Sequence, residues 1–368
     1  MLGRRRRLAL LAEGCFTTFE AKTAVGVLRY RADEVAAVID STRAGTTAAA
    51  CVGAGGSIPV VADVTAAAEA GADGLLIGVA PRGGELPAEW RAIVCAALDR
   101  GWDVLSGLHV FLADDPELAA RAAVRGARLL DVRRPAAARL VATRRAADLE
   151  ALVVLTVGSD CNVGKMTAAL EICRALEGLG LHASFVATGQ TGIFVADRGV
   201  AVDAVPADFV AGVVEELVVD AARLADVVMV EGQGALHHPG YSGVTLALLH
   251  GACPAAMILC HHPRRGHIRS HGPSPSDAPV EAQDPIIPPL HELVRAYESA
   301  AAWVAVGRVT GIALHTGDLS EAEARSEIDA AKRATGLPAT DPVRFGAETL
   351  ARELARLHAQ RRSRATLP

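Results

Sequence analysis

Apolar runs alternate with amphipathic stretches from Arg7 to about Val132. The apolar runs are RLALLAEG, VAAVIDS, GLLIGVA, DVLSGLHVFL and ARLLDVR, and helix-like stretches such as DVTAAAEAGA and ELPAEWRAIVCAALDRG lie between them. Such an alternation is typical of βαβ units on a parallel sheet. The pattern therefore predicts an α/β fold that begins with an open Rossmann-like domain over residues 1–132.

A break in this pattern separates two regions. Residues 133–150, RRPAAARLVATRRAADLE, are rich in Pro, Ala and Arg and lack strand periodicity, so they are predicted to be a linker. A second alternating series starts at Leu152, with the strand-like runs VVLTVG, ASFVATG, DVVMVEG, AAMILCHH and VAVGRVTGIALHT. It closes with the helix SEAEARSEIDAAKRATG and the short segment LPATDP. We expect a second parallel sheet over residues 151–368, and the glycine-punctuated stretch GSDCNVGK after VVLTVG makes this domain resemble those of P-loop NTPases.

Composition agrees with two α/β domains. The chain has 368 residues, too many for one ordinary core, with 51% hydrophobic and only 4% aromatic residues. Packing by small residues is therefore favoured over an aromatic-rich β-sandwich. The net charge of −5 creates no field that attracts nucleic acid or an anionic membrane, so neither is expected as a partner.

The sequence offers no clear export or membrane signal. The N-terminal apolar run LALLA is shorter than the roughly 7–15 residues of a signal core, and Glu13 ends it. The apolar run 244–260 is interrupted by His250, Gly251 and Pro254. Seven cysteines without a CxxC pair indicate reduced thiols. We therefore expect a cytoplasmic protein.

The strand-like run VVLTVG leads into a glycine-punctuated loop and a helix. Glycines let backbone N–H groups converge on a phosphate, and the following helix adds its positive end. A lysine there neutralises phosphate charge; a glycine-rich turn with a solvated lysine is the alternative. The predicted cofactor-binding residues are Gly158, Ser159, Asp160, Cys161, Asn162, Val163, Gly164, Lys165, Met166 and Thr167.

The spacing of this loop departs from the ordinary pattern G-x-x-x-x-G-K-[ST]. Five residues separate Gly158 from Gly164, and Met166 lies between Lys165 and Thr167. One helical residue turns a side chain by about 100°, so Thr167 should not point where a hydroxyl directly after the lysine would. The loop is therefore expected to hold a phosphate without a well-placed Mg²⁺ ligand, and no metal site is predicted.

The long loop and a later strand end resemble dethiobiotin synthetase. That family carries G-T-D-x-x-V-G-K-T and E-G-A-G, and this chain has GSDCNVGKMT and VEGQGA. The resemblance implies that Glu231 faces the loop, where the family uses a carboxylate to help hold Mg²⁺; a helix-capping carboxylate is the alternative. Relatives of this type carry a metal-binding Asp near TGQTG, where this chain offers Gln190 and Thr191.

Longer stretches extend the resemblance over nearly the whole chain. They are FTTFEAKTAVGVLRYRADEVAAVIDS, DVLSGLHVFLADDPELA, TVGSDCNVGKMTAALE, FVATGQTGIF, DAVPADFVAG, VVMVEGQGALHHPGYSGVTLALLHG, HIR and LPATDPVRFG. Together they resemble a bacterial family with an N-terminal Rossmann-like domain and a C-terminal P-loop domain, whose best-defined type is D-glutamate N-acetyltransferase. The resemblance implies acetyl transfer from acetyl-CoA to the amine of D-glutamate or a related acidic amino acid, with the CoA phosphates on the loop.

Such a reaction requires a base for the amine and a donor for the oxyanion. Glu231 and His237 or His238, in GQGALHHPG, are the candidates for the base. The two histidines are equally compatible with loop residues bonded to backbone.

Basic and neutral polar groups elsewhere are candidates for binding the amino acid. The stretch CHHPRRGHIRSHG offers arginines that match carboxylates with paired donors. A zinc site and a solvated loop are the alternatives, although no familiar tetrahedral spacing occurs there. In FTTFEAKTAVG a lysine is expected to face a cleft between the domains, and a helix start capped by a threonine is the alternative. The candidate substrate-binding residues are Lys22, Gln190, Thr191, Arg264 and Arg269.

Two other functions remain open at this point. One is an ATP-dependent ligase or kinase of the dethiobiotin synthetase type, which would use Mg²⁺ and ATP to activate a carboxylate. The other is a nucleotide-sensing protein that binds ATP without turnover. A homo-oligomer with a small-molecule amino-acid substrate is expected in the preferred case.

Overall fold

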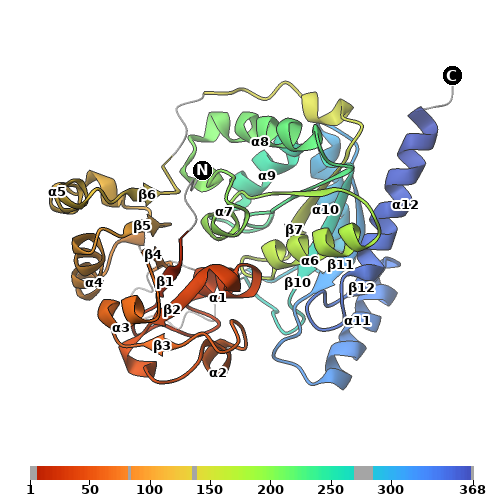
Figure 1. Cartoon of the computed structure of the whole chain (residues 1–368). Helices are drawn as coiled ribbons and strands as arrows, with labels where there is room; N and C mark the ends of the chain where they lie inside the picture. Colours follow the sequence, from red (N-terminus) through yellow and green to blue (C-terminus); the bar gives the residue numbers. More distant parts are fainter. Residues whose placement is uncertain (1–5, 82–83, 135–138, 269–284, 366–368) are drawn as a thin grey trace. The chain divides into compact units, whose positions relative to one another are not determined.

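The computed structural model describes residues 6–81, 84–134, 139–268 and 285–365 (Figure 1). The chain forms two compact units. The first contains Met1–Ala136 and Gly189–Ala204, and the second contains Ala137–Thr188 and Val205–Pro368. Residues 189–204 thus belong to the first unit although they lie between stretches of the second. The domain limits at residues 132 and 151 stay a prediction.

The first unit is built on a six-stranded parallel sheet in the order β3-β2-β1-β4-β5-β6. Its strands are β1 (Leu8–Leu11), β2 (Val35–Ile39), β3 (Val60–Val61), β4 (Gly74–Ile77), β5 (Asp103–Ser106) and β6 (Leu129–Asp131). Its helices are α1 (Lys22–Tyr30), α2 (Ala48–Val52), α3 (Val64–Glu69), α4 (Ala88–Asp99), α5 (Pro116–Arg125) and α7 (Gln190–Ala196).

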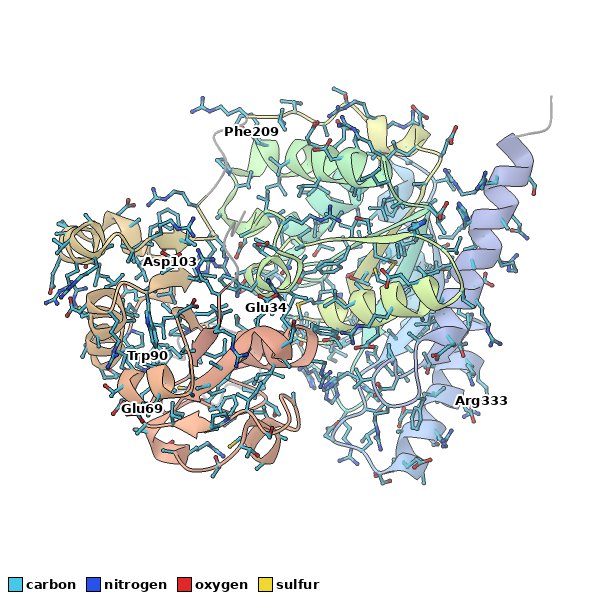
Figure 2. The ribbon with its side chains drawn as sticks, viewed as in Figure 1. Glu34, Glu69, Trp90, Asp103, Phe209 and Arg333 are labelled. Carbon is cyan, nitrogen blue, oxygen red and sulfur yellow. The ribbon has the colours of Figure 1, made fainter. Side chains whose placement is uncertain are left out.

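Helices cover both faces of this first sheet. The crossover from β1 to β2 runs in the opposite direction to the crossovers from β3 through β6, so the right-handed rule puts α1 on one face and α3, α4 and α5 on the other. The three helices form a row in Figure 1, and α1 packs against α7. Trp90 of α4 is buried, and buried Asp103, at the start of β5, pairs with Arg6 and Arg128 (both Trp90 and Asp103 are labelled in Figure 2).

The second unit has its own six-stranded parallel sheet, in the order β12-β11-β10-β7-β9-β8. Its strands are β7 (Leu152–Gly158), β8 (Ala183–Val186), β9 (Val227–Val230), β10 (Ala256–His261), β11 (Arg308–Leu314) and β12 (Ala339–Thr340). Its helices are α6 (Lys165–Gly178), α8 (Ala207–Ala222), α9 (Ser242–Ala252), α10 (Leu290–Ala302), α11 (Glu321–Thr335) and α12 (Glu348–Ala365). Both sheets confirm the predicted α/β fold with two parallel sheets.

The central strand β7 is buried along its whole length, which explains its unbroken apolar run. Helices α6 and α12 pack together on one face, and α8, α9, α10 and α11 form a continuous row on the other. Because all strands are parallel, the segments that follow β7, β8, β9 and β10 meet at one edge of the sheet. That edge carries the predicted phosphate loop.

Helices α7 and α12 are among those not expected from the sequence. Helix α7 has only seven residues and reads QTGIFVA, too short for a helical period to be recognised. Helix α12 follows LPATDPVRFG and is rich in arginine and glutamate. Among the described residues no helix is both long and apolar enough to span a bilayer.

Candidate active site

The phosphate loop, residues 158–167, connects β7 to α6. Its backbone turns through left-handed conformations at Asn162, with φ of 57°, and at Gly164, with φ of 91°. A Cβ atom at Gly158 would lie 2.8 Å from Lys165 Nζ and 2.9 Å from the Asp160 carbonyl oxygen, so only glycine fits there. The loop therefore closes tightly around the lysine and the first amide groups of α6, which have no partner within the helix.

Lys165 is the buried cation of this loop. Its side chain is only 7% exposed, and Nζ donates a hydrogen bond to the Asp160 carbonyl oxygen at 2.7 Å. Burial lowers the pKa of Lys165, and nearby Cys161, Cys260 and Asp160 oppose that shift. An anion bound in the loop would stabilise the charged ammonium, which burial alone disfavours.

Arg265 braces the loop from outside. Its guanidinium donates to Asp160 Oδ2 at 3.0 Å, to the Cys161 carbonyl oxygen at 2.5 Å and to the Asn162 carbonyl oxygen at 3.1 Å. Arg264, by contrast, points to an exposed partner, Glu323, at 2.8 Å. The predicted Arg269 lies outside the described residues.

The segment after β9 faces the loop. Glu231 is 5% exposed, and its Oε2 accepts the Thr188 amide at 3.0 Å, while Thr188 Oγ1 donates to the Glu231 carbonyl oxygen at 2.7 Å. The next residue, Gly232, donates its amide to Thr156 Oγ1 at 2.9 Å, and a Cβ there would overlap the Thr156 carbonyl oxygen. Glu231 is thus tied to the end of β8.

Two histidines follow in the histidine loop, residues 232–240. Neither ring nitrogen of His237 has a hydrogen-bond partner among the described residues. Burial lowers the pKa of His237, and the Ser159 backbone and the Asp160 carboxylate partly oppose the shift. A neutral His237 carries a lone pair, as a proton acceptor must. His238 differs, because its Nδ1 accepts the Gly240 amide at 3.1 Å.

Tyr297, from α10, joins the two loops and was not predicted. Its side chain is fully buried, and its hydroxyl donates to the Gly158 carbonyl oxygen at 2.7 Å. The Tyr297 hydroxyl oxygen in turn accepts the amides of Leu236 at 3.2 Å and Gly158 at 3.3 Å. Burial raises the pKa of the Tyr297 phenol, so the hydroxyl keeps its proton. In the sequence, Leu293 and Tyr297 lie four residues apart, and this spacing indicates only the apolar face of a helix.

A second contact supports the start of the loop. His261, at the end of β10, lies 2.8 Å through Nδ1 from Ser159 Oγ. Burial, with the neighbouring His262 and Arg265, lowers the pKa of His261 to about 4, so this ring is neutral at physiological pH. Ser159 is completely buried in this contact. We infer that the contact between His261 and Ser159 stabilises the phosphate loop.

Three side chains at the loop have the composition of a metal site. One potential ligand atom each of Asp160, Cys161 and His238 lies within 4.8 Å of the others. However, Asp160 already pairs with Arg265, and His238 Nδ1 accepts the Gly240 amide, which leaves the proton of the neutral ring on Nε2. A metal ion bound by these groups would therefore have to displace the Arg265 and Gly240 contacts.

The remaining predicted substrate-binding residues lie in the first unit. Lys22 is the first residue of α1, and its Nζ lies 5.1 Å from the centroid of the Phe19 ring. Gln190 Oε1 accepts a hydrogen bond from Arg133 at 2.8 Å, and Thr191 Oγ1 lies 2.9 Å from Thr23 Oγ1. The side chains of Gln190 and Thr191 therefore contact residues of their own unit.

Comparison with known proteins identifies relatives of the whole chain. Residues 140–351 match the domain of unknown function DUF1611_C, described as a P-loop domain, and residues 41–135 match DUF1611_N, described as a Rossmann-like domain. A D-glutamate N-acetyltransferase from Tritonibacter scottomollicae is 42% identical over 287 residues, which are 78% of this chain and 82% of that protein. A protein of the same name from a Pseudoalteromonas species is 35% identical over 291 residues, 78% of this chain and 83% of that protein.

A solved structure extends the likeness to the fold. The crystal structure of a DUF1611 family protein from Anabaena variabilis, at 2.30 Å resolution, has a TM-score of 0.88 and 38% sequence identity. The match covers 95% of this chain and 99% of that one. These matches, together with the two parallel sheets and the phosphate loop, show that the chain belongs to the DUF1611 family, with a Rossmann-like and a P-loop domain.

Proposed function

We propose that this protein is an N-acetyltransferase that moves the acetyl group of acetyl-CoA to the amine of an acidic amino acid, with D-glutamate as the first candidate. The observation that carries the proposal is the 42% identity, over 78% of the chain, to a protein named D-glutamate N-acetyltransferase. A second relative of the same name, at 35% identity, supports it independently.

The phosphate loop supplies the cofactor part of the proposal. Coenzyme A carries a pyrophosphate and a ribose phosphate, which match the buried ammonium of Lys165 and the amides at the start of α6. Acetyl transfer leaves these phosphates intact. A hydroxyl ligand for Mg²⁺ directly after the lysine is therefore unnecessary, and Met166 at that position is compatible with the function.

The chemical step needs a proton acceptor near the reacting amine. The amine nitrogen attacks the thioester carbonyl carbon, the N–C bond forms and the C–S bond breaks. The amine proton passes to the base and then to the CoA thiolate, so atoms and charge balance. His237 fits the base best, because it is neutral and neither ring nitrogen has a described partner. This role requires the pantetheine arm to fold back toward the loop, because the arm separates the thioester from the pyrophosphate.

Glu231 fits a supporting role rather than the base. Its carboxylate accepts the Thr188 amide, and the Thr188 hydroxyl returns a bond to the Glu231 carbonyl oxygen, so the side chain is fixed between the ends of β8 and β9. This arrangement orients the backbone that leads into the histidine loop. We therefore propose Glu231 as a positioning residue.

Binding of a dicarboxylate requires cations outside the phosphate loop. Lys22, Arg264 and Arg269 remain the proposed groups for this task. Gln190 and Thr191 remain proposed neutral donors, and either side chain would have to exchange its present contact, with Arg133 or Thr23, for the substrate.

A second candidate function is ATP-dependent activation of a carboxylate. The observation in its favour is the dethiobiotin synthetase-like loop with Glu231 on the facing strand end. Against it stand the displaced Thr167 hydroxyl and the lack of an aspartate in TGQTG after the strand ASFVATG. A third candidate, a nucleotide sensor, predicts ATP binding without any product.

Incubation of the full chain with acetyl-CoA and a panel of amino acids tests the proposal. The panel comprises D-glutamate, L-glutamate, D-aspartate and D-alanine, each analysed by mass spectrometry for the N-acetyl product. We expect product from an acidic member, fastest with D-glutamate, and none from D-alanine. No N-acetyl product from any acidic amino acid, together with ATP consumption under Mg²⁺, would favour the ligase.

A further inference from the structure

The histidine loop contains a polar atom that the proposed transfer step does not use. His238 is only 5% exposed, and its Nε2 atom is buried without a hydrogen-bond partner in the described part of the chain. A buried polar atom without a partner costs free energy, so such atoms normally have one. His238 Nε2 therefore indicates a partner that arrives with a ligand.

The local backbone determines what kind of partner this is. The Gly240 amide donates to His238 Nδ1 at 3.1 Å, so Nδ1 must keep its lone pair. In the neutral ring the proton is then on Nε2, which makes Nε2 a donor. The missing partner is an acceptor, and a metal ion is excluded for the same reason.

The position of the ring places His238 at the phosphate loop. One ring nitrogen of His238 lies within 4.8 Å of a carboxylate oxygen of Asp160 and of Cys161 Sγ. The Asp160 carboxylate accepts the Cys161 amide at 2.6 Å and pairs with Arg265 at 3.0 Å. An acceptor that enters next to these groups approaches the same loop that holds Lys165.

A rigid link fixes the distance between the two loops. The Tyr297 hydroxyl bonds to both backbone groups of Gly158 in the phosphate loop and to the Leu236 amide in the histidine loop. It is fully buried, so the link is not exchanged with water. Displacement of one loop therefore moves the other.

We propose that the histidine loop forms a second wall of the phosphate site, in which His238 Nε2–H donates to a phosphate oxygen and Tyr297 holds that donor at the phosphate loop. The ligand class is a metal-free phosphate or pyrophosphate ester, bound in part by this hydrogen-bond donor. The inference rests on the phosphate-binding part of the proposed function and assigns His238 to the cofactor instead of to proton abstraction.

Calorimetry of the full chain with inorganic pyrophosphate in excess EDTA tests this assignment. His238→Phe keeps the ring and removes the donor, and we expect about tenfold weaker binding or more. His238→Gln retains a side-chain N–H and should recover part of the loss. His291→Phe, the same change at an exposed position on α10, should leave the affinity unchanged.

Pyrophosphate binding by Tyr297 variants tests whether Tyr297 positions His238. Tyr297→Phe should weaken pyrophosphate binding in protein that melts cooperatively. The double variant with His238→Phe should lose less than the product of the two single losses, because both changes act through the same donor. Nitrogen-15 chemical shifts of His238 should show the Nε2–H tautomer in the wild type.

The outcomes separate the inference from the proposed function. Wild-type protein that binds neither pyrophosphate nor CoA would overturn both. Wild-type binding that His238→Phe leaves unchanged, or that requires Mg²⁺, would overturn the role of His238 alone. Parallel titrations with CoA and with ATP show which natural ester supplies the phosphate.

Discussion

The loops that follow β1 and β7 begin equivalent βα units of two parallel sheets, yet the polar groups at the two loops differ in whether they have partners within the protein. In the first unit, the Asp40 carboxylate at the end of β2 accepts the amides of Gly14 and Phe16, both at 3.2 Å. It is completely buried and also accepts the Thr42 amide and hydroxyl. An internal anion thus occupies the amides of this loop.

In the second unit, the corresponding sheet edge carries the phosphate loop and has polar atoms that an external anion could contact. Lys165 is buried, and among the described residues its Nζ donates to the Asp160 carbonyl oxygen, while both ring nitrogens of His237 and Nε2 of His238 lack a partner there. Sheet order therefore does not decide which edge binds a ligand. In the first unit a carboxylate from the neighbouring strand end occupies the loop amides, whereas we propose that the phosphate loop of the second unit takes an external anion.

The largest expected effect concerns the close packing of Gly232 against Thr156, next to the phosphate loop. Gly232→Ala would place a Cβ atom onto the Thr156 carbonyl oxygen, a backbone atom that cannot rotate away. We expect a loss of stability of about 4 kcal/mol or more, or failure to fold. Gly243→Ala, at an open position on α9, is the matched control and should retain stability in urea unfolding. Equal midpoints for the two variants would contradict the packing argument.

The next effect tests the internal anion of the first unit. Asp40→Ala leaves buried amides without an acceptor, and we expect about 3 kcal/mol lower free energy of unfolding. Asp63→Ala removes a helix cap that accepts only the Ala66 amide and should cost about 1 kcal/mol. Folded Asp40→Ala protein should bind CoA with normal affinity. A CoA affinity that falls in parallel with stability would mean that the two edges are not independent.

The proposed base predicts a pH dependence. The lowered pKa of His237 keeps the ring neutral down to pH values below the ordinary histidine range. As pH falls through that lowered pKa, the base is protonated, so kcat/KM should fall on the acid side and stay level at neutral pH. His237→Ala should lower kcat about 100-fold and remove this acid limb. An unchanged kcat with only a raised KM for acetyl-CoA would reassign His237 to phosphate binding.

The cation of the loop gives a smaller effect on binding. Lys165→Ala removes a buried charge-assisted contact, and we expect CoA affinity to fall by on the order of 2 kcal/mol while the fold survives. Lys332→Ala, an exposed lysine of α11 paired with Asp329, serves as control. Calorimetry that finds the same affinity in both variants would remove Lys165 from the site.

The order of the strands was largely predictable because most of the apolar runs singled out in the sequence are buried strands. The runs at Leu152–Gly158 and Val227–Val230 became β7 and β9, and the glycines around Lys165 indicated the loop between β7 and α6. Helix α7 was missed because its short apolar sequence packs against α1 of the same unit, which lies far away in the sequence. Arg31 bonds to the Phe194 carbonyl oxygen there, a contact far apart in sequence.

Details of the site depended on contacts that spacing does not encode. Two adjacent arginines, Arg264 and Arg265, looked equivalent, but only Arg265 reaches the phosphate loop. Two adjacent histidines looked equivalent until the turn at Gly240 fixed the proton of His238. Tyr297 carried no chemical signal, since a buried tyrosine on an amphipathic helix is usually a core residue.

We propose that the phosphate loop of the second unit binds the phosphates of acetyl-CoA without a metal ion. Calorimetric titration of the full chain compares acetyl-CoA in excess EDTA with ATP in excess Mg²⁺, followed by the transfer assay in the same two buffers. We expect tight acetyl-CoA binding and undiminished acetyl transfer in EDTA, with weaker binding of Mg-ATP. Binding of Mg-ATP alone, or transfer that EDTA abolishes and Mg²⁺ restores, would contradict it.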